Sequence, residues 1–268
     1  MKRCLFGLAI LAASTHADEF TITADVPYVT PPADVHQAER CKLDISSPTG
    51  ARDLPVLVFF HGGGLTGGAK HFPEMDRAGL VVVTAGYRLL KPEVAWPAPA
   101  EDAAAAVAWV FKNIQGFGGD PKRIFVSGHS AGGYLCAIVG MDARWLKPHG
   151  KSNLDLAGII PVSAQVTTHF AVKKTLGDTG EQYRPLITPE APLYHCAAKL
   201  PPVCLITGDR KIEFPCRVEE NELMAISLRT LKHPRTEFHE LPGKDHSTVA
   251  PAAAPFVRQF IATVTQPR

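Results

Sequence analysis

Apolar, β-rich runs alternate with helix-like patterns along most of the chain. Apolar runs within residues 54–64, which end in glycines, and within residues 79–89 predict buried strands. The alanine-rich segment 100–114, with acidic residues in its first turn, predicts a helix. The alternation continues, with further strands predicted at 123–128, 156–164, 201–209 and 236–243 and further helices at 131–141, 218–232 and 251–264.

This alternation predicts a mostly parallel sheet covered by helices on both faces. Ligands of such sheets bind outside the carboxyl ends of the strands. Residues 165–200 break the pattern with mixed polarity, several prolines and weak periodicity. They are predicted to form a short cap or lid within a single domain that covers residues 18–268.

The first 17 residues have a different pattern from the rest of the chain. Lys2 and Arg3 precede a short apolar run, and the small residues Thr15 and Ala17 follow it. This order is typical of a secretory signal peptide and predicts cleavage after Ala17 and a secreted or periplasmic protein. The apolar run is too short for a stable membrane anchor. A buried N-terminal helix is the alternative interpretation.

Composition narrows the possible partners. Hydrophobic residues make up 46% of the chain and charged residues 20%, as in ordinary globular proteins. The net charge is only +2 and no basic run is present, so no nucleic-acid partner is expected. The cysteines show no CxxC pair and no His/Cys cluster with zinc-ligand spacing, which predicts no metal.

The candidate chemistry begins with the pentapeptide GHSAG, residues 128–132, which lies between a predicted strand and a predicted helix. This context fits the G-x-S-x-G turn that exposes a nucleophilic serine. Gly128 and Gly132 permit the tight turn, and Ser130 is the predicted nucleophile. A serine needs a base, an orienting acid and an oxyanion site to act.

The predicted oxyanion site is the sequence HGGG, residues 61–64, directly after the first apolar strand. Glycines there let backbone N–H groups approach a substrate oxygen closely. The predicted donors are the N–H groups of Gly63, Gly64 and Ala131, with His61 anchoring the loop. A phosphate-binding loop is the alternative, but the Lys-Ser/Thr ending that it requires is missing.

The acid and the base are expected after the serine, in the order acid then histidine. Asp209 ends the apolar strand 201–209 and is the predicted acid, with Glu213 as the alternative. His246 follows the last predicted strand in a glycine-containing loop and is the predicted base. Asp245 is too close to His246 in sequence to orient its ring.

The segments HGGG, YRL (residues 87–89), GGDPKRIFVSGHSAGG and DHS resemble α/β-hydrolase esterases of the hormone-sensitive-lipase type and the related bacterial feruloyl and acetylxylan esterases. The resemblance runs from about Lys42 to the C-terminus. It implies an α/β-hydrolase fold with an eight-stranded sheet and no cofactor. It also implies that Ser130, Asp209 and His246 form the triad beside the predicted oxyanion site.

The chain departs from that pattern at two positions. His129 stands before the serine where many relatives have aspartate, and Asp209 is followed by arginine instead of proline. These departures, and the short N-terminal region, favour a shorter branch that resembles carbohydrate esterases and arylformamidases.

The predicted function is that of a serine carboxylesterase acting on short-chain acyl esters, for example acetyl or feruloyl esters of plant polysaccharides. The expected partner is a small-molecule or polysaccharide-linked ester. Gln165, Thr168 and His169 follow a strand end and are predicted to line the substrate pocket. An arylformamidase-type amidase is the main alternative; a lipase, a peptidase and a non-catalytic hydrolase-fold binding module are less favoured.

Overall fold

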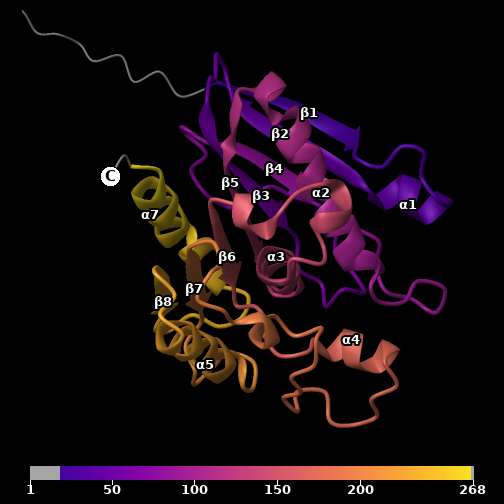
Figure 1. The fold of residues 1–268 in the computed structure, drawn as a ribbon, viewed down its shortest axis with the longest axis vertical. Helices are drawn as coiled ribbons and strands as arrows, with labels where there is room; N and C mark the ends of the chain where they lie inside the picture. The colour runs from indigo at the N-terminus through magenta and orange to yellow at the C-terminus, as the bar shows by residue number, and fades with distance from the viewer. Residues whose placement is uncertain (1–18, 267–268) are drawn as a thin grey trace, which may run out of the picture.

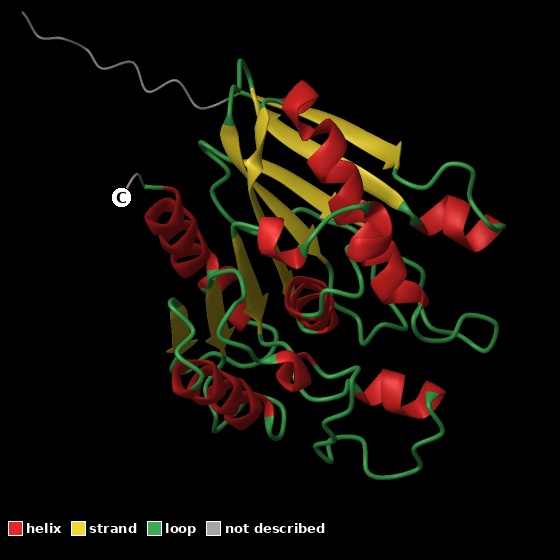
Figure 2. Ribbon diagram, in the orientation of Figure 1, coloured by secondary structure: helices red, strands yellow, loops and turns green. Residues whose placement is uncertain are grey.

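The computed structural model describes residues 19–266, which form one eight-stranded sheet with helices on both faces (Figures 1 and 2). The strands are β1 (Phe20–Pro27), β2 (Lys42–Pro48), β3 (Leu54–Phe60), β4 (Val81–Ala85), β5 (Gly119–His129), β6 (Gly158–Val162), β7 (Val203–Thr207) and β8 (Thr236–Glu240). The helices are α1 (Val35–Arg40), α2 (Ala98–Asn113), α3 (Ala131–Met141), α4 (Phe170–Thr175), α5 (Arg217–Thr230), α6 (Val249–Ala252) and α7 (Ala254–Thr265).

The strand order is β1-β2-β4-β3-β5-β6-β7-β8. The six neighbouring strands β4, β3, β5, β6, β7 and β8 pair in parallel. At the other edge of the sheet, β1 pairs antiparallel with β2, and β2 pairs antiparallel with β4. The predicted fold class, a mostly parallel α/β-hydrolase sheet, is therefore confirmed. The antiparallel β1 and β2 were not among the strands predicted, because each mixes polar and apolar residues and forms no apolar run.

Two hydrophobic cores, one on each face of the sheet, join it to the helices. Side chains of α2, α3 and α5 pack on one face, and those of α6 and α7 pack on the other. Figure 1 shows α7 on the opposite side of the sheet from α2 and α3. The predicted helix 251–264 begins earlier than expected and divides into α6 and α7.

The segment between β6 and β7 contains α4, the 3₁₀ turn Pro192–His195 and irregular loops. It occupies the position of the predicted cap. The predicted signal peptide lies outside the described residues and stays a prediction. Among the helices of residues 19–266, none combines the length and the apolar character needed to cross a membrane.

Candidate active site

Ser130 lies at the sharp turn between β5 and α3, at the carboxyl edge of the sheet. Its φ of 57° falls in the left-handed region, as a strained nucleophile turn requires. The turn needs glycine on both sides. A Cβ on Gly128 would overlap the backbone of Gly132, and a Cβ on Gly132 would overlap the Phe60 carbonyl. The Ser130 N–H donates to the Val162 carbonyl at 2.9 Å, which ties the turn to β6.

His246 reaches Ser130 from the loop after β8. Its Nε2 lies 2.9 Å from the Ser130 Oγ, within hydrogen-bond distance of the proton that a base would remove. The Phe214 ring stacks on the imidazole, with centroids 4.0 Å apart and planes inclined by 18°. The structure thus brings the predicted nucleophile and the predicted base together.

The carboxylate beside His246 belongs to Glu213, and the prediction of Asp209 is wrong in this respect. Glu213 Oε1 lies 2.7 Å from His246 Nδ1. The Asp209 carboxylate instead accepts the N–H groups of Gly243 (2.8 Å) and Lys211 (2.9 Å). After β7 the chain turns tightly, because the N–H groups of residues 212 and 213 donate to the Asp209 carbonyl. This turn brings the side chain of Glu213 back over the sheet edge.

The Glu213 side chain is fully buried yet well supplied with donors. It accepts hydrogen bonds from the hydroxyl of Ser163 and from the N–H of Phe214, besides the one from His246. Burial alone would raise its pKa, but these hydrogen bonds outweigh burial and lower the pKa to about 2. The carboxylate therefore remains ionised at neutral pH, as a group that stabilises an imidazolium must.

Ser163 is a residue that the sequence analysis missed. It follows β6 with a φ of 46°, and its Oγ also lies 3.3 Å from His246 Nδ1. The buried guanidinium of Arg217 donates to the Ser163 carbonyl and lies 3.2 Å from the Glu220 carboxylate. Glu220 in turn accepts from Thr167 at 2.6 Å. This buried network holds Ser163 beside Glu213, and nothing in its sequence spacing indicates the contact.

Replacing Ser163 by alanine should lower kcat by about tenfold, because one hydrogen bond to a charged group is lost. KM should stay unchanged, because Ser163 holds the carboxylate and does not contact the substrate. Steady-state kinetics on a short-chain ester measure both values. Ser46→Ala is the matched control, since Ser46 is a buried serine on the distant strand β2. A rise in KM with kcat preserved would contradict the positioning role.

The HGGG loop lies over Ser130. A Cβ on Gly62 would stand 3.4 Å from the Ser130 Cβ. Gly63 and Gly64 have φ values of 115° and 64°, which favour glycine. Within residues 19–266, no hydrogen bond uses the N–H groups of Gly63, Gly64 or Ala131. These three donors remain available for a substrate oxygen.

His61 anchors this loop, in agreement with the sequence analysis. The Tyr87 hydroxyl donates to the His61 carbonyl at 2.7 Å, and the two rings stack with centroids 4.3 Å apart. Burial lowers the pKa of His61 to about 4, so its ring is neutral at pH 7.

His129, at the position before the serine, packs against His246 with ring centroids 4.8 Å apart. Its Nε2 lies 2.8 Å from the His246 carbonyl. Burial, reinforced by the neighbouring His246, lowers the pKa of His129 to about 4. His129 is therefore neutral at pH 7 and does not repel a proton on His246. It supports the backbone of the loop that carries the base.

The structure places Gln165 and His169 inside their own loop, and their predicted role in lining the substrate pocket stays a prediction. Both are buried within the segment after β6. The Gln165 amide accepts from the Phe170 N–H, and the His169 Nδ1 accepts from the Ala171 N–H at the start of α4. The third predicted residue, Thr168, is buried as well. The apolar and polar pattern could not show that these side chains fold back into their own loop.

An aromatic wall, formed by Phe170, Tyr183 and Phe214, borders the site. Phe170 approaches the position of a Gly64 Cβ within 3.2 Å. The Tyr183 ring centroid lies 6.2 Å from that of Phe170 and 5.9 Å from that of Phe214. Since Phe214 stacks on His246, the wall extends from the HGGG loop to the histidine.

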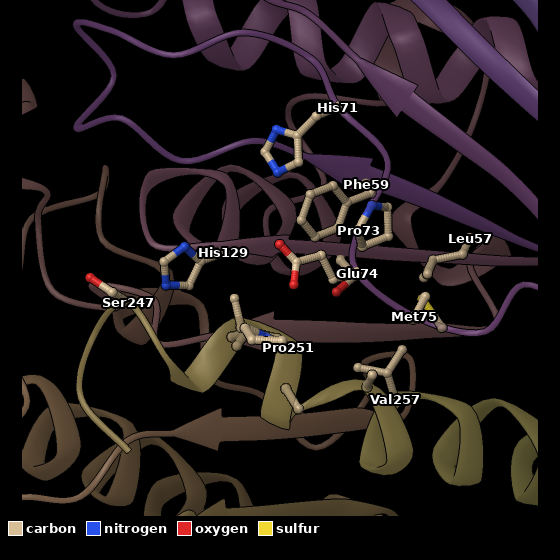
Figure 3. Close-up of a pocket in the computed structure, with 15 residues that line it drawn as sticks. Leu57, Phe59, His71, Pro73, Glu74, Met75, His129, Ser247, Pro251 and Val257 are labelled. Carbon is tan, nitrogen blue, oxygen red and sulfur yellow. The ribbon is translucent and has the colours of Figure 1, made fainter.

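A cavity of about 130 Å³, lined in part by His129, lies on the α6/α7 side of the sheet. Figure 3 shows His129 and Ser247 at one end and Met75 and Val257 at the other. Its walls are mainly apolar and are formed by Leu57, Phe59, Pro73, Met75, Val162, Ala250, Pro251, Ala253, Ala254 and Val257. Ser130 is not among the residues that line it, so the cavity adjoins the triad without containing the nucleophile.

Comparison with known proteins places this site in a family. The model of the BD-FAE family matches residues 43–219, and the chain belongs to that family. The carboxylesterase NlhH of Mycobacterium tuberculosis is 44% identical over 104 residues, which cover 36% of this chain and 32% of NlhH. Esterase LipC of the same species is 26% identical over 219 residues, which cover 73% of this chain and 53% of LipC. The chain thus spans a third to a half of these two relatives.

Solved structures give the fold. A truncated carbohydrate esterase from gut microbiota superimposes with a TM-score of 0.74 at 16% identity, covering 91% of this chain and 96% of that protein. Thermogutta terrifontis esterase 2, phosphoramylated by tabun, gives a TM-score of 0.72 at 22% identity, covering 92% of this chain and 97% of that one. These similarities establish the α/β-hydrolase fold.

Proposed function

We propose that this protein is a serine carboxylesterase that acts through an acyl-enzyme on Ser130. The observation that carries the proposal is the continuous hydrogen-bonded chain of Ser130 Oγ, His246 and Glu213, with distances of 2.9 and 2.7 Å. Membership of the BD-FAE family and the esterase names of its relatives support the same activity. A non-catalytic binding module would have no need of this complete arrangement.

In the proposed reaction, His246 removes the Ser130 proton as the hydroxyl oxygen attacks the ester carbonyl. The N–H groups of Gly63, Gly64 and Ala131 stabilise the developing oxyanion. Glu213 orients the imidazole and stabilises its positive charge. His246 then protonates the leaving alcohol, and a water molecule repeats the sequence and releases the acid. The reaction uses water alone and needs no cofactor.

The aromatic wall and the neighbouring cavity support a small acyl group or an aromatic ring as the part of the substrate that the site recognises. Aromatic side chains stack favourably on a planar ring such as that of a feruloyl group. Acetyl and feruloyl esters of plant polysaccharides are therefore the proposed substrates. We propose that residues 1–17 direct export of the protein out of the cytoplasm, where it would encounter such polymers.

A hydrolysis panel tests the proposal. It compares p-nitrophenyl acetate, butyrate and octanoate with methyl ferulate, acetylated xylan and N-formylkynurenine, using wild type and Ser130→Ala. We expect turnover of the short esters and of methyl ferulate by the wild type alone. Turnover confined to the formyl amide would favour an amidase that uses the same residues. No turnover by folded protein would favour the binding module.

Tyr183→Ala should lower kcat/KM for methyl ferulate by about fivefold, because aromatic contacts contribute about 1 kcal/mol each. The rate with methyl acetate, which carries no aromatic ring, should change little, because it offers nothing for this ring to stack on. Tyr194→Ala is the matched control, since Tyr194 is exposed on the turn Pro192–His195. An equal loss on both esters would show that Tyr183 does not select aromatic substrates.

A further inference from the structure

A second group of chemically active side chains lies away from the triad, where β7 meets the edge strand β8. It consists of Cys204, Glu237 and His239, whose ligand atoms all lie within 4.8 Å of one another. No step of the proposed ester hydrolysis uses them. The sequence analysis found no metal motif because Cys204 is far from the other two residues in sequence.

The strand register brings the three side chains to one face. Cys204 pairs with Glu237, and Ile206 pairs with His239. Because side chains alternate along a strand, Glu237 and His239 point to the same side of β8, and Cys204 is directly opposite Glu237. This is the face covered by α7, where the His239 ring lies 4.8 Å from that of Phe256.

The distances suit a tetrahedral metal ion. His239 Nε2 lies 3.4 Å from Glu237 Oε2. Nitrogen and oxygen ligands on one tetrahedral zinc ion are about 3.3 Å apart, given bonds of about 2.0–2.1 Å. The spacing is long for a strong hydrogen bond between the two groups. The sulfur must approach to about 3.6 Å from both, a shift that the partly exposed Glu237 and His239 side chains can share.

The charges of the three side chains also suit a divalent cation. Arg235 lies 3.4 Å from the other oxygen of Glu237, Oε1, so that among the described side chains Oε2 is paired with His239 Nε2 alone. A bound divalent cation deprotonates a coordinating thiol. One thiolate, one carboxylate and one neutral imidazole then balance a charge of +2.

We propose that Cys204, Glu237 and His239 bind one divalent transition-metal ion of the zinc type, with water in the fourth position. The mixed sulfur, nitrogen and oxygen ligands are those that Zn²⁺ prefers, whereas Ca²⁺ and Mg²⁺ prefer oxygen alone. The ion joins the edge strand β8 to β7. Its expected effect is on the stability of this edge, since the site takes no part in the proposed reaction.

The test is a titration of the untagged, metal-free full chain with Co²⁺, a spectroscopic substitute for Zn²⁺. We expect one equivalent to produce a thiolate-to-cobalt absorption band that Zn²⁺ abolishes. Zn²⁺ should also raise Tm, because it binds the folded chain. Absence of the band would overturn the proposal.

Variants separate this site from adventitious binding. Cys204→Ser should abolish the thiolate band, and His239→Gln should weaken Co²⁺ affinity by more than about tenfold, as losses at metal sites do. His239→Gln changes a partly exposed side chain, so it remains informative if Cys204→Ser fails to fold. Cys216→Ser removes the exposed thiol and should leave the band intact. A band that disappears only in Cys216→Ser would overturn the proposal.

Discussion

Glu213→Gln is expected to lower kcat by roughly 10³–10⁴-fold, the scale of loss when a triad acid is neutralised. Glutamine keeps the shape of the side chain but removes the negative charge 2.7 Å from His246 Nδ1. The imidazolium that forms as Ser130 attacks then loses its stabilising partner. Since the pKa of Glu213 is lowered to about 2, the charge is present in the wild type throughout the neutral range.

Asp209→Asn is the matched control, because Asp209 was the carboxylate predicted from the sequence. Its carboxylate holds the turn at Gly243, close to the loop that carries His246, but does not touch the imidazole. We expect Asp209→Asn to change kcat by less than about tenfold, as the loss of a surface hydrogen bond would. Circular dichroism and Tm of both variants establish that they are folded. The reverse order of effects would restore Asp209 as the acid.

Ser130→Ala is expected to lower kcat by about 10⁶-fold, because the residues of a triad act as a unit. The N–H donors of the oxyanion site remain in this variant, so a small residual rate above water is expected. The double variant Ser130→Ala/Glu213→Gln should be no slower than Ser130→Ala, since the carboxylate has no role without the nucleophile. Retention of more than about 1% of the wild-type rate in Ser130→Ala would exclude Ser130 as the nucleophile.

The sequence predicted those features that depend on local pattern. Unbroken apolar runs identified the central strands, and glycines on both sides of Ser130 identified the turn, because only a glycine fits against the Phe60 carbonyl. The position of His246 followed from its place after the last strand. Each of these inferences uses residues whose roles are set by their immediate neighbours in the chain.

Features that depend on how a loop folds were predicted less well. Asp209 and Glu213 are both acidic residues after β7, and only the tight turn at the Asp209 carbonyl decides which one reaches His246. The same reason applies to Gln165 and His169, whose side chains point into their own loop. The cluster at Cys204 depends on the register between two strands, which the sequence does not specify.

The role of Ser130 as the nucleophile is tested most directly by identifying the residue that an organophosphate ester labels. Cleavage after Arg123 and Arg144 releases a peptide that contains Ser127 and Ser130, and fragmentation in the mass spectrometer distinguishes the two. We expect one adduct, on Ser130, which forms much more slowly in Glu213→Gln and at the wild-type rate in Asp209→Asn. An adduct on another residue, or ester turnover that continues without any adduct, would contradict that role.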